Sequence, residues 1–174
     1  MKSNHSTKIR PQQTAAQPRF FDNRDCLCVY SDPILILCPI CQKPGSLELR
    51  KVDRDKRRWQ AQRFFGCHTC GHSFVWKPPL VIHSVRDWDK VLPLLLQTKC
   101  CSKNLWAFNA AHLEFIERYS QAFIRERTSS SNASLASRLP QWIKAAKNRD
   151  SILKAMKKLK RTLANRKDLT NKRF

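Results

Sequence analysis

The clearest helical pattern in the chain covers residues 108–128. Charged residues alternate there with apolar residues at intervals of three and four positions, which places the apolar ones on one face of a helix. The apolar residues are Leu113, Ile116, Tyr119 and Phe123. A run of serines follows and predicts a loop. We therefore expect one amphipathic helix over this range, with its apolar face against a core.

Further helical patterns lie on both sides of this one. Residues 86–97 are compatible with a helix if Pro93 lies near its start or at a kink. Pro140 suits the first turn of a short helix, and Asp150 is placed to cap the next one. The apolar face of that last helix would hold Ile152, Met156, Leu159 and Leu163.

Strand patterns come before these helices. Leucines alternate with charged residues over 46–52, and short apolar runs at 59–65 and 73–76 are typical of two further strands. The charged segment 53–58 would form the tip of a hairpin between the first two strands. The patterns therefore predict an α+β protein, in which a small three-stranded module is followed by an α-helical, basic C-terminal region.

Two Cys-x-x-Cys pairs flank the predicted strands. Two thiolates at this spacing can bind one metal ion from a single tight turn, and two such turns complete a tetrahedron of sulfur. The turns favour residues with permissive backbone angles just beyond the second cysteine: Gly71 follows the second pair directly, and Pro44-Gly45 closes the first turn. The sequence thus predicts one structural Zn²⁺ bound by Cys38, Cys41, Cys67 and Cys70.

The paired cysteines and the strands between them resemble the zinc-ribbon family over about residues 37–77. The resemblance implies two cysteine knuckles that clamp a three-stranded antiparallel sheet, and it implies no particular molecular task. His68 and His72 adjoin the second pair and are alternative ligands. Four cysteines without knuckle spacing are expected as buried thiols, with a second metal site as the alternative: Cys26, Cys28, Cys100 and Cys101.

The net positive charge of the chain indicates a candidate binding partner. The chain carries 34 Lys and Arg against 13 Asp and Glu, a net +21, which favours a polyanion such as nucleic acid. Residues 129–174 alone carry 13 basic and 2 acidic groups. The predicted nucleic-acid contacts are Arg54, Lys56, Arg57 and Arg58 at the hairpin tip, and Lys144, Lys147, Arg149, Lys154, Lys157, Lys158 and Arg161 in the C-terminal helices.

The aromatic residues of the ribbon are a weaker candidate for contacts with unpaired bases, because a module this small needs them for its own core. These residues are Trp59, Phe64, Phe65, Phe74 and Trp76.

Catalytic motifs are missing from the sequence. It contains no phosphate-binding glycine loop, no dinucleotide-binding glycine motif and no serine elbow. Asp53 and Asp55 lie among cations, which disfavours recruitment of a catalytic metal ion. We therefore expect no enzyme and no small-molecule substrate. Two alternatives stay open: a protein–protein adaptor that docks through its ribbon and helices, and a nuclease of unfamiliar type.

The patterns divide the chain into a flexible N-terminal segment (1–24), a zinc-ribbon domain (25–83), a helical domain (84–165) and a basic tail (166–174). The first 18 residues lack the apolar core of a signal peptide. We expect a cytoplasmic location, in the nucleoid or nucleus if the chain binds nucleic acid, and no membrane partner. The function predicted is a zinc-dependent nucleic-acid-binding accessory of a larger complex, with DNA favoured over RNA and with protein partners in that complex.

Overall fold

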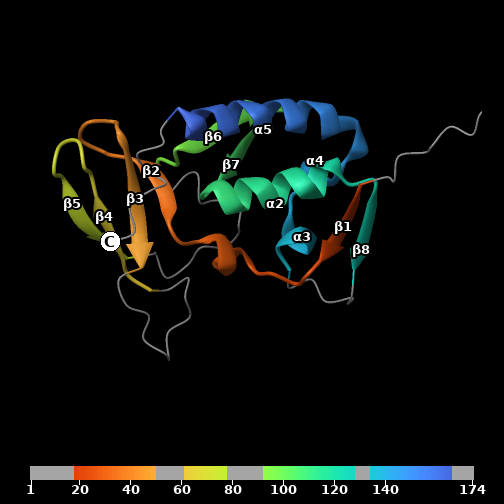
Figure 1. Cartoon of the computed structure of the whole chain (residues 1–174), viewed down its shortest axis with the longest axis horizontal. Coiled ribbons are helices and arrows are strands. Elements are labelled where there is room, and N and C mark those ends of the chain that lie inside the picture. The colour runs from red at the N-terminus through yellow and green to blue at the C-terminus, as the bar shows by residue number, and fades with distance from the viewer. Residues whose placement is uncertain (1–17, 50–60, 78–91, 128–133, 166–174) are drawn as a thin grey trace, which may run out of the picture.

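The computed structural model describes residues 18–49, 61–77, 92–127 and 134–165, which contain both helices and strands, as an α+β class requires (Figure 1). The elements are β1 (Arg19–Asp22), the 3₁₀ helix η1 (Leu27–Tyr30), β2 (Ile34–Leu37), β3 (Pro44–Leu49), β4 (Arg63–Gly66), β5 (Ser73–Trp76), β6 (Leu96–Cys100), β7 (Lys103–Ala107), α2 (Ala110–Gln121), β8 (Ile124–Arg127), α3 (Leu135–Arg138), α4 (Gln141–Lys144), the 3₁₀ helix η2 (Ala146–Asn148) and α5 (Arg149–Ala164).

The strands that carry the cysteine pairs form a four-stranded antiparallel sheet in the order β2-β3-β4-β5. The prediction of three strands is therefore wrong by one, because β2 precedes the first cysteine. Its sequence is apolar at every position and shows no alternation. The structure gives the reason: Ile34 and Ile36 pack into the core of the sheet, while Leu35 packs into the core of the helical half.

The helix predicted over 108–128 is shorter than expected. α2 begins after Asn109, whose side-chain oxygen accepts a hydrogen bond from the N–H of His112 at 3.0 Å. It ends at Gln121, because the N–H of Phe123 donates to the carbonyl of Pro18 at 2.9 Å and the chain continues as β8. β8 pairs in parallel with β1. The segment predicted as flexible through residue 24 therefore contains a strand.

The helix predicted over 86–97 is also wrong in its described part. Leu94 forms an isolated bridge with Ile36, and β6 begins at Leu96. In the C-terminal region the predicted apolar face of α5 is confirmed for Ile152, Met156 and Leu159, which are buried, and Leu163 is half-buried. Pro140, predicted in the first turn of a helix, is the N-cap of α4. Asp150, predicted as an N-cap, lies inside the first turn of α5.

Backbone hydrogen bonds join the sheet to the helical half across the boundary predicted at residues 83–84. The N–H of Leu35 donates to the carbonyl of Phe108 at 2.8 Å, and the N–H of Leu95 donates to the carbonyl of Leu35 at 3.0 Å. Figure 1 shows the four-stranded sheet at one end of the molecule and the β1–β8 pair at the other, with α2 and α5 between them. No helix among the described residues is long and apolar enough to cross a membrane.

Gly45 in β3 leaves no room for a side chain. A Cβ at this position would lie 2.4 Å from Cε2 of Phe65, whose ring is fully buried. Gly45→Ala is therefore expected to lower the free energy of unfolding by about 1–3 kcal/mol, as overpacked cores do. Denaturant unfolding measures this effect. Gly66→Ala is the matched control, because its nearest neighbour would be Phe64 Cε1 at 3.4 Å, and an equal loss in both variants would contradict the explanation.

Candidate metal centre

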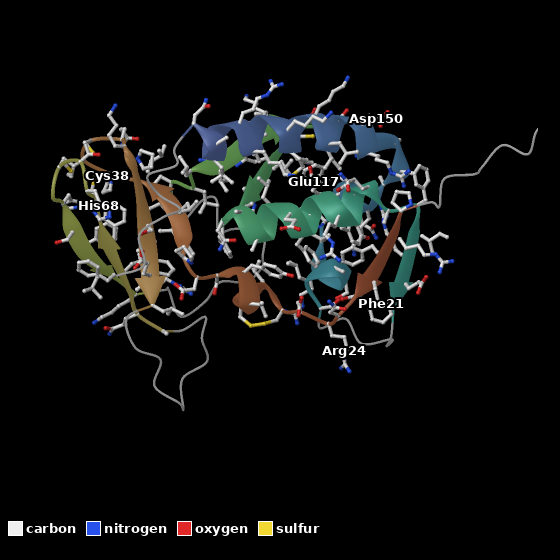
Figure 2. The ribbon with its side chains drawn as sticks, viewed as in Figure 1. Phe21, Arg24, Cys38, His68, Glu117 and Asp150 are labelled. Carbon is white, nitrogen blue, oxygen red and sulfur yellow. A yellow bond between two sulfur atoms is a disulfide. The ribbon has the colours of Figure 1, made fainter. Side chains whose placement is uncertain are left out.

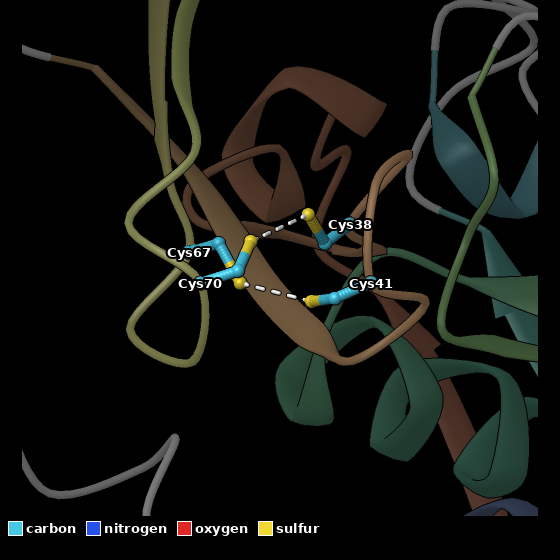
Figure 3. Close-up of side chains that lie close together, drawn as sticks. All are labelled: Cys38, Cys41, Cys67 and Cys70. Carbon is cyan, nitrogen blue, oxygen red and sulfur yellow. Dashed lines mark hydrogen bonds between the residues drawn. The ribbon is translucent and has the colours of Figure 1, made fainter.

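The four predicted ligands come together at the end of the sheet. Cys38 and Cys41 lie in the turn between β2 and β3, and Cys67 and Cys70 lie in the turn between β4 and β5 (Figure 3). The Sγ atoms of Cys38 and Cys70 are 3.7 Å apart, and those of Cys41 and Cys67 are 3.5 Å apart. All four sulfur atoms lie within 4.8 Å of one another. The group could therefore hold one metal ion.

The two cysteine turns share one backbone geometry. In each, the N–H of the residue after the second cysteine donates to the carbonyl of the first: Gln42 to Cys38 and Gly71 to Cys67, both at 2.9 Å. Both donors have positive φ, 57° at Gln42 and 72° at Gly71. The role predicted for Gly71 is thus confirmed. The first turn uses Gln42 instead of Gly45, whose position in β3 is explained by its contact with Phe65.

The four cysteines differ in their access to solvent. Cys38 and Cys67 are buried in the core of the sheet, Cys41 is half-buried and Cys70 is exposed. Phe65, which lies in the same core cluster as Cys38 and Cys67, is stacked on Phe74 with ring centres 4.8 Å apart. The group thus has an apolar base formed by the strands and an open side through which an ion could enter.

The surroundings of the thiols give them unequal pKa values. Desolvation is the largest influence on Cys67 and raises its pKa, but hydrogen bonds from the backbone N–H groups of Cys70 and Thr69 and from neighbouring thiols lower it to about 6. For Cys70, the backbone hydrogen bond at His72 lowers the pKa, while desolvation and the other three thiols raise it to about 12. Cys67 therefore ionises more readily than Cys70, which must release a proton to bind a metal ion.

The other candidate metal ligands lie outside this group of four cysteines. Within the described ranges, the four knuckle cysteines are the only group of three or more potential ligands close enough to share an ion, and His68 and His72 do not belong to it. Cys26 and Cys28 form a disulfide, so the expectation of free thiols is wrong for this pair. Cys100 is a buried thiol and Cys101 a half-buried one, with sulfur atoms 3.7 Å apart.

The predicted nucleic-acid contacts fall into three groups. Four of them, Arg54, Lys56, Arg57 and Arg58, lie outside the described residues. Two direct their charged groups to backbone carbonyls: Lys144 Nζ donates to Ser137 at 2.5 Å, and Arg149 Nη2 donates to Ala122 at 3.0 Å. The others are exposed: Lys147, Lys154, Lys157, Lys158 and Arg161.

The residue of this centre that the sequence did not single out is Gln42. Glutamine has no special preference for positive φ, so nothing in its identity marks the position. The only available signal was its place directly after the second cysteine of a pair, which Gly71 shares.

Comparisons of the chain with models of known protein families, with curated proteins and with solved structures find no match.

Proposed function

We propose that the chain is a nucleic-acid-binding protein with one structural zinc ion. Four thiolates are the ligand set that Zn²⁺ takes in structural sites, and a tetrahedral ion with Zn–S bonds of about 2.3 Å places its sulfur atoms about 3.8 Å apart. The sulfur distances of 3.5 and 3.7 Å support this assignment. A full set of four protein ligands leaves no open position for a substrate, so the ion would act in folding.

The observation that carries the binding proposal is a row of cations on α5. Lys154, Lys157, Lys158 and Arg161 recur at intervals of three and four residues, so they share one face of the helix. All four are exposed, whereas Ile152, Met156 and Leu159 on the opposite face are buried. We call these four residues the α5 row.

Among the described residues, no ion pair involves a member of the α5 row. Glu117 pairs with Lys160, which lies beside the row. The only acidic residue within α5 is Asp150, in its first turn. Four neighbouring cations on a solvated helix are suited to contact phosphates, which carry the salt-sensitive part of nucleic-acid affinity. In the proposed accessory role, the metal centre would maintain the fold of the sheet, and α5 would supply the affinity for nucleic acid.

A salt titration of binding tests this proposal. Wild-type protein should bind labelled duplex and single-stranded probes in a shift assay, and four phosphate contacts from the α5 row predict a log–log slope of about −4 for duplex DNA. Raising the salt from 50 to 200 mM should then weaken binding about 150- to 250-fold. A slope near zero would reject phosphate contacts and favour the protein–protein adaptor instead.

A further inference from the structure

A cavity of about 110 Å³ lies between β1, β8, α2 and the short helices α3 and α4. It is found at the end of the molecule where Figure 2 labels Phe21 and Arg24, which flank Asp22 in sequence. The charged side chains that line it are Asp22, Arg125, Glu126 and Lys144. We call this space the β1–β8 cavity.

Asp22 places a buried carboxylate in the wall of the β1–β8 cavity. It is only 6 % exposed. Its Oδ2 accepts a hydrogen bond from Oγ of Ser134 at 2.6 Å, and its Oδ1 accepts one from the N–H of Arg24 at 3.0 Å. These bonds fix the carboxylate, but among the described side chains no cation forms an ion pair with it. A cationic group in the cavity would therefore stabilise this buried charge.

Arg125 lines the same cavity from β8. Its guanidinium lies 4.3 Å from the centre of the Tyr119 ring. Nε donates to the carbonyl of Tyr119 at 3.3 Å, and Nη1 donates to the carbonyl of Lys144 at 2.9 Å. These contacts hold the guanidinium in one orientation, and no described residue bonds to Nη2. A guanidinium fixed in this way is suited to bind a carboxylate through two hydrogen bonds.

The paired strands hold these two charges apart. Arg125 is the strand partner of Phe20, and Asp22 lies two residues further along β1 on the same buried face. With strands about 4.8 Å apart and a rise of about 3.3 Å per residue, the two Cα atoms are separated by about 8 Å. Asp22 and Arg125 thus line one cavity without forming an ion pair with each other.

The charges of the lining favour a ligand that carries both signs. Asp22 would repel a simple anion, and Arg125 and Lys144 would repel a simple cation. Glu126 adds little to this balance, because it pairs with Arg19 at 3.1 Å. A small zwitterion can meet the carboxylate with its positive end and the guanidinium with its negative end.

The size of the cavity limits this ligand further. A cavity of about 150 Å³ accommodates benzene, so the β1–β8 cavity, which is open to solvent, admits molecules of about five or six non-hydrogen atoms. Glycine and alanine are zwitterions of this size. Phe20 and Ala136 are buried residues of the wall and offer an apolar contact for a methyl group.

We propose that the β1–β8 cavity binds a small α-amino acid. The carboxylate of the ligand accepts hydrogen bonds from Arg125, and its ammonium group donates to Asp22. This site uses no residue of the metal centre or of the α5 row. The inference therefore goes beyond the proposed function, and the failure of either leaves the other in place.

Isothermal titration calorimetry of the full chain with glycine and L-alanine tests the proposal. Both amino acids should bind with one site per chain. Acetate and methylammonium each carry only one of the two charges and should bind at least about 10-fold more weakly than L-alanine, because each lacks one charged hydrogen-bond partner. L-Phenylalanine should not bind, because its side chain exceeds the space available.

Substitutions locate the ligand in the cavity. Asp22→Asn and Arg125→Gln should each weaken L-alanine binding about 10- to 100-fold. The matched control is Asp150→Asn, which changes an exposed carboxylate on α5 and should leave the affinity unchanged. Ala136→Val keeps both charges and narrows the cavity, so it should weaken L-alanine binding at least about 10-fold even if a charge variant fails to fold. Circular dichroism identifies the variants that fold.

Three outcomes would overturn the proposal. Absence of binding by both amino acids would leave the cavity to water alone. Acetate or methylammonium binding as tightly as L-alanine would remove the requirement for two charges. Undiminished L-alanine affinity in Ala136→Val, or in a folded Asp22→Asn variant, would place the ligand elsewhere.

Discussion

Removal of the metal ion is expected to unfold the four-stranded sheet β2–β5. The two turns that carry the cysteines place four sulfur atoms within 4.8 Å of one another, so a single ion bound by all four would tie the turns together. Without an ion, the thiolates that form there would repel one another. Structural zinc sites contribute about 10–16 kcal/mol of apparent binding free energy at neutral pH, which a sheet of this size does not recover from its small core.

Chelation and substitution of a ligand should give the same result. Treatment with a strong chelator, or Cys38→Ser at the most buried ligand, should abolish the near-UV circular dichroism of the aromatic residues in the sheet. Because β2 also bonds to residues 93–108, the melting temperature of the remaining core should fall as well. Elemental analysis should find one zinc ion per wild-type chain and none in the variant.

Cys101→Ser provides the matched control for this experiment. Cys101 is a half-buried free thiol outside the metal centre, so its substitution should leave the zinc content and the near-UV spectrum unchanged. A near-UV spectrum that survives metal removal in the wild type would contradict a structural role for the ion. A zinc content of two would reveal a second site beyond the knuckle cysteines.

The grouping of the four cysteines could be predicted from the sequence because its determinants are local. Each pair of ligands lies within four residues, and Gly71 marks the end of one turn. β2 could not be predicted in the same way, because its pattern depends on the two different cores that cover its faces. Alternation signals a strand with one buried face and gives no signal for a strand with two.

The β1–β8 pair could not be predicted for a different reason. Ile124–Arg127 has the composition of a continued helix, and only the distant partner Arg19–Asp22 makes it a strand. Phe123 fits the helical spacing of the preceding residues, yet its N–H bonds to Pro18 and its ring is exposed. Local periodicity carries no information on such long-range pairing, which here decides whether an aromatic residue belongs to a core or to a surface.

Neutralisation of the α5 row is expected to remove most of the nucleic-acid affinity. In the variant Lys154→Gln/Lys157→Gln/Lys158→Gln/Arg161→Gln, four phosphate contacts are lost. Each contact releases about 0.9 counterions from duplex DNA, so the log–log salt slope should become less negative by about 3 to 4. The affinity at 100 mM salt should fall about 100- to 1,000-fold, for single-stranded and duplex probes alike. Glutamine keeps the helix propensity of lysine, so the thermal stability should change little.

A second quadruple variant separates the position of these charges from their number. Lys43, Lys77, Lys99 and Lys103 are exposed and lie outside the α5 row, so their change to glutamine lowers the net charge equally. Phosphate contact by α5 requires a much smaller loss of affinity in this control. An equal loss of affinity in both variants would mean that the total charge of the chain, and not the position of the α5 row, determines binding. If affinity persists in the α5 variant and is lost when Arg54, Lys56, Arg57 and Arg58 are changed to glutamine, the contacts belong to the segment 53–58, and the α5 row has no part in binding.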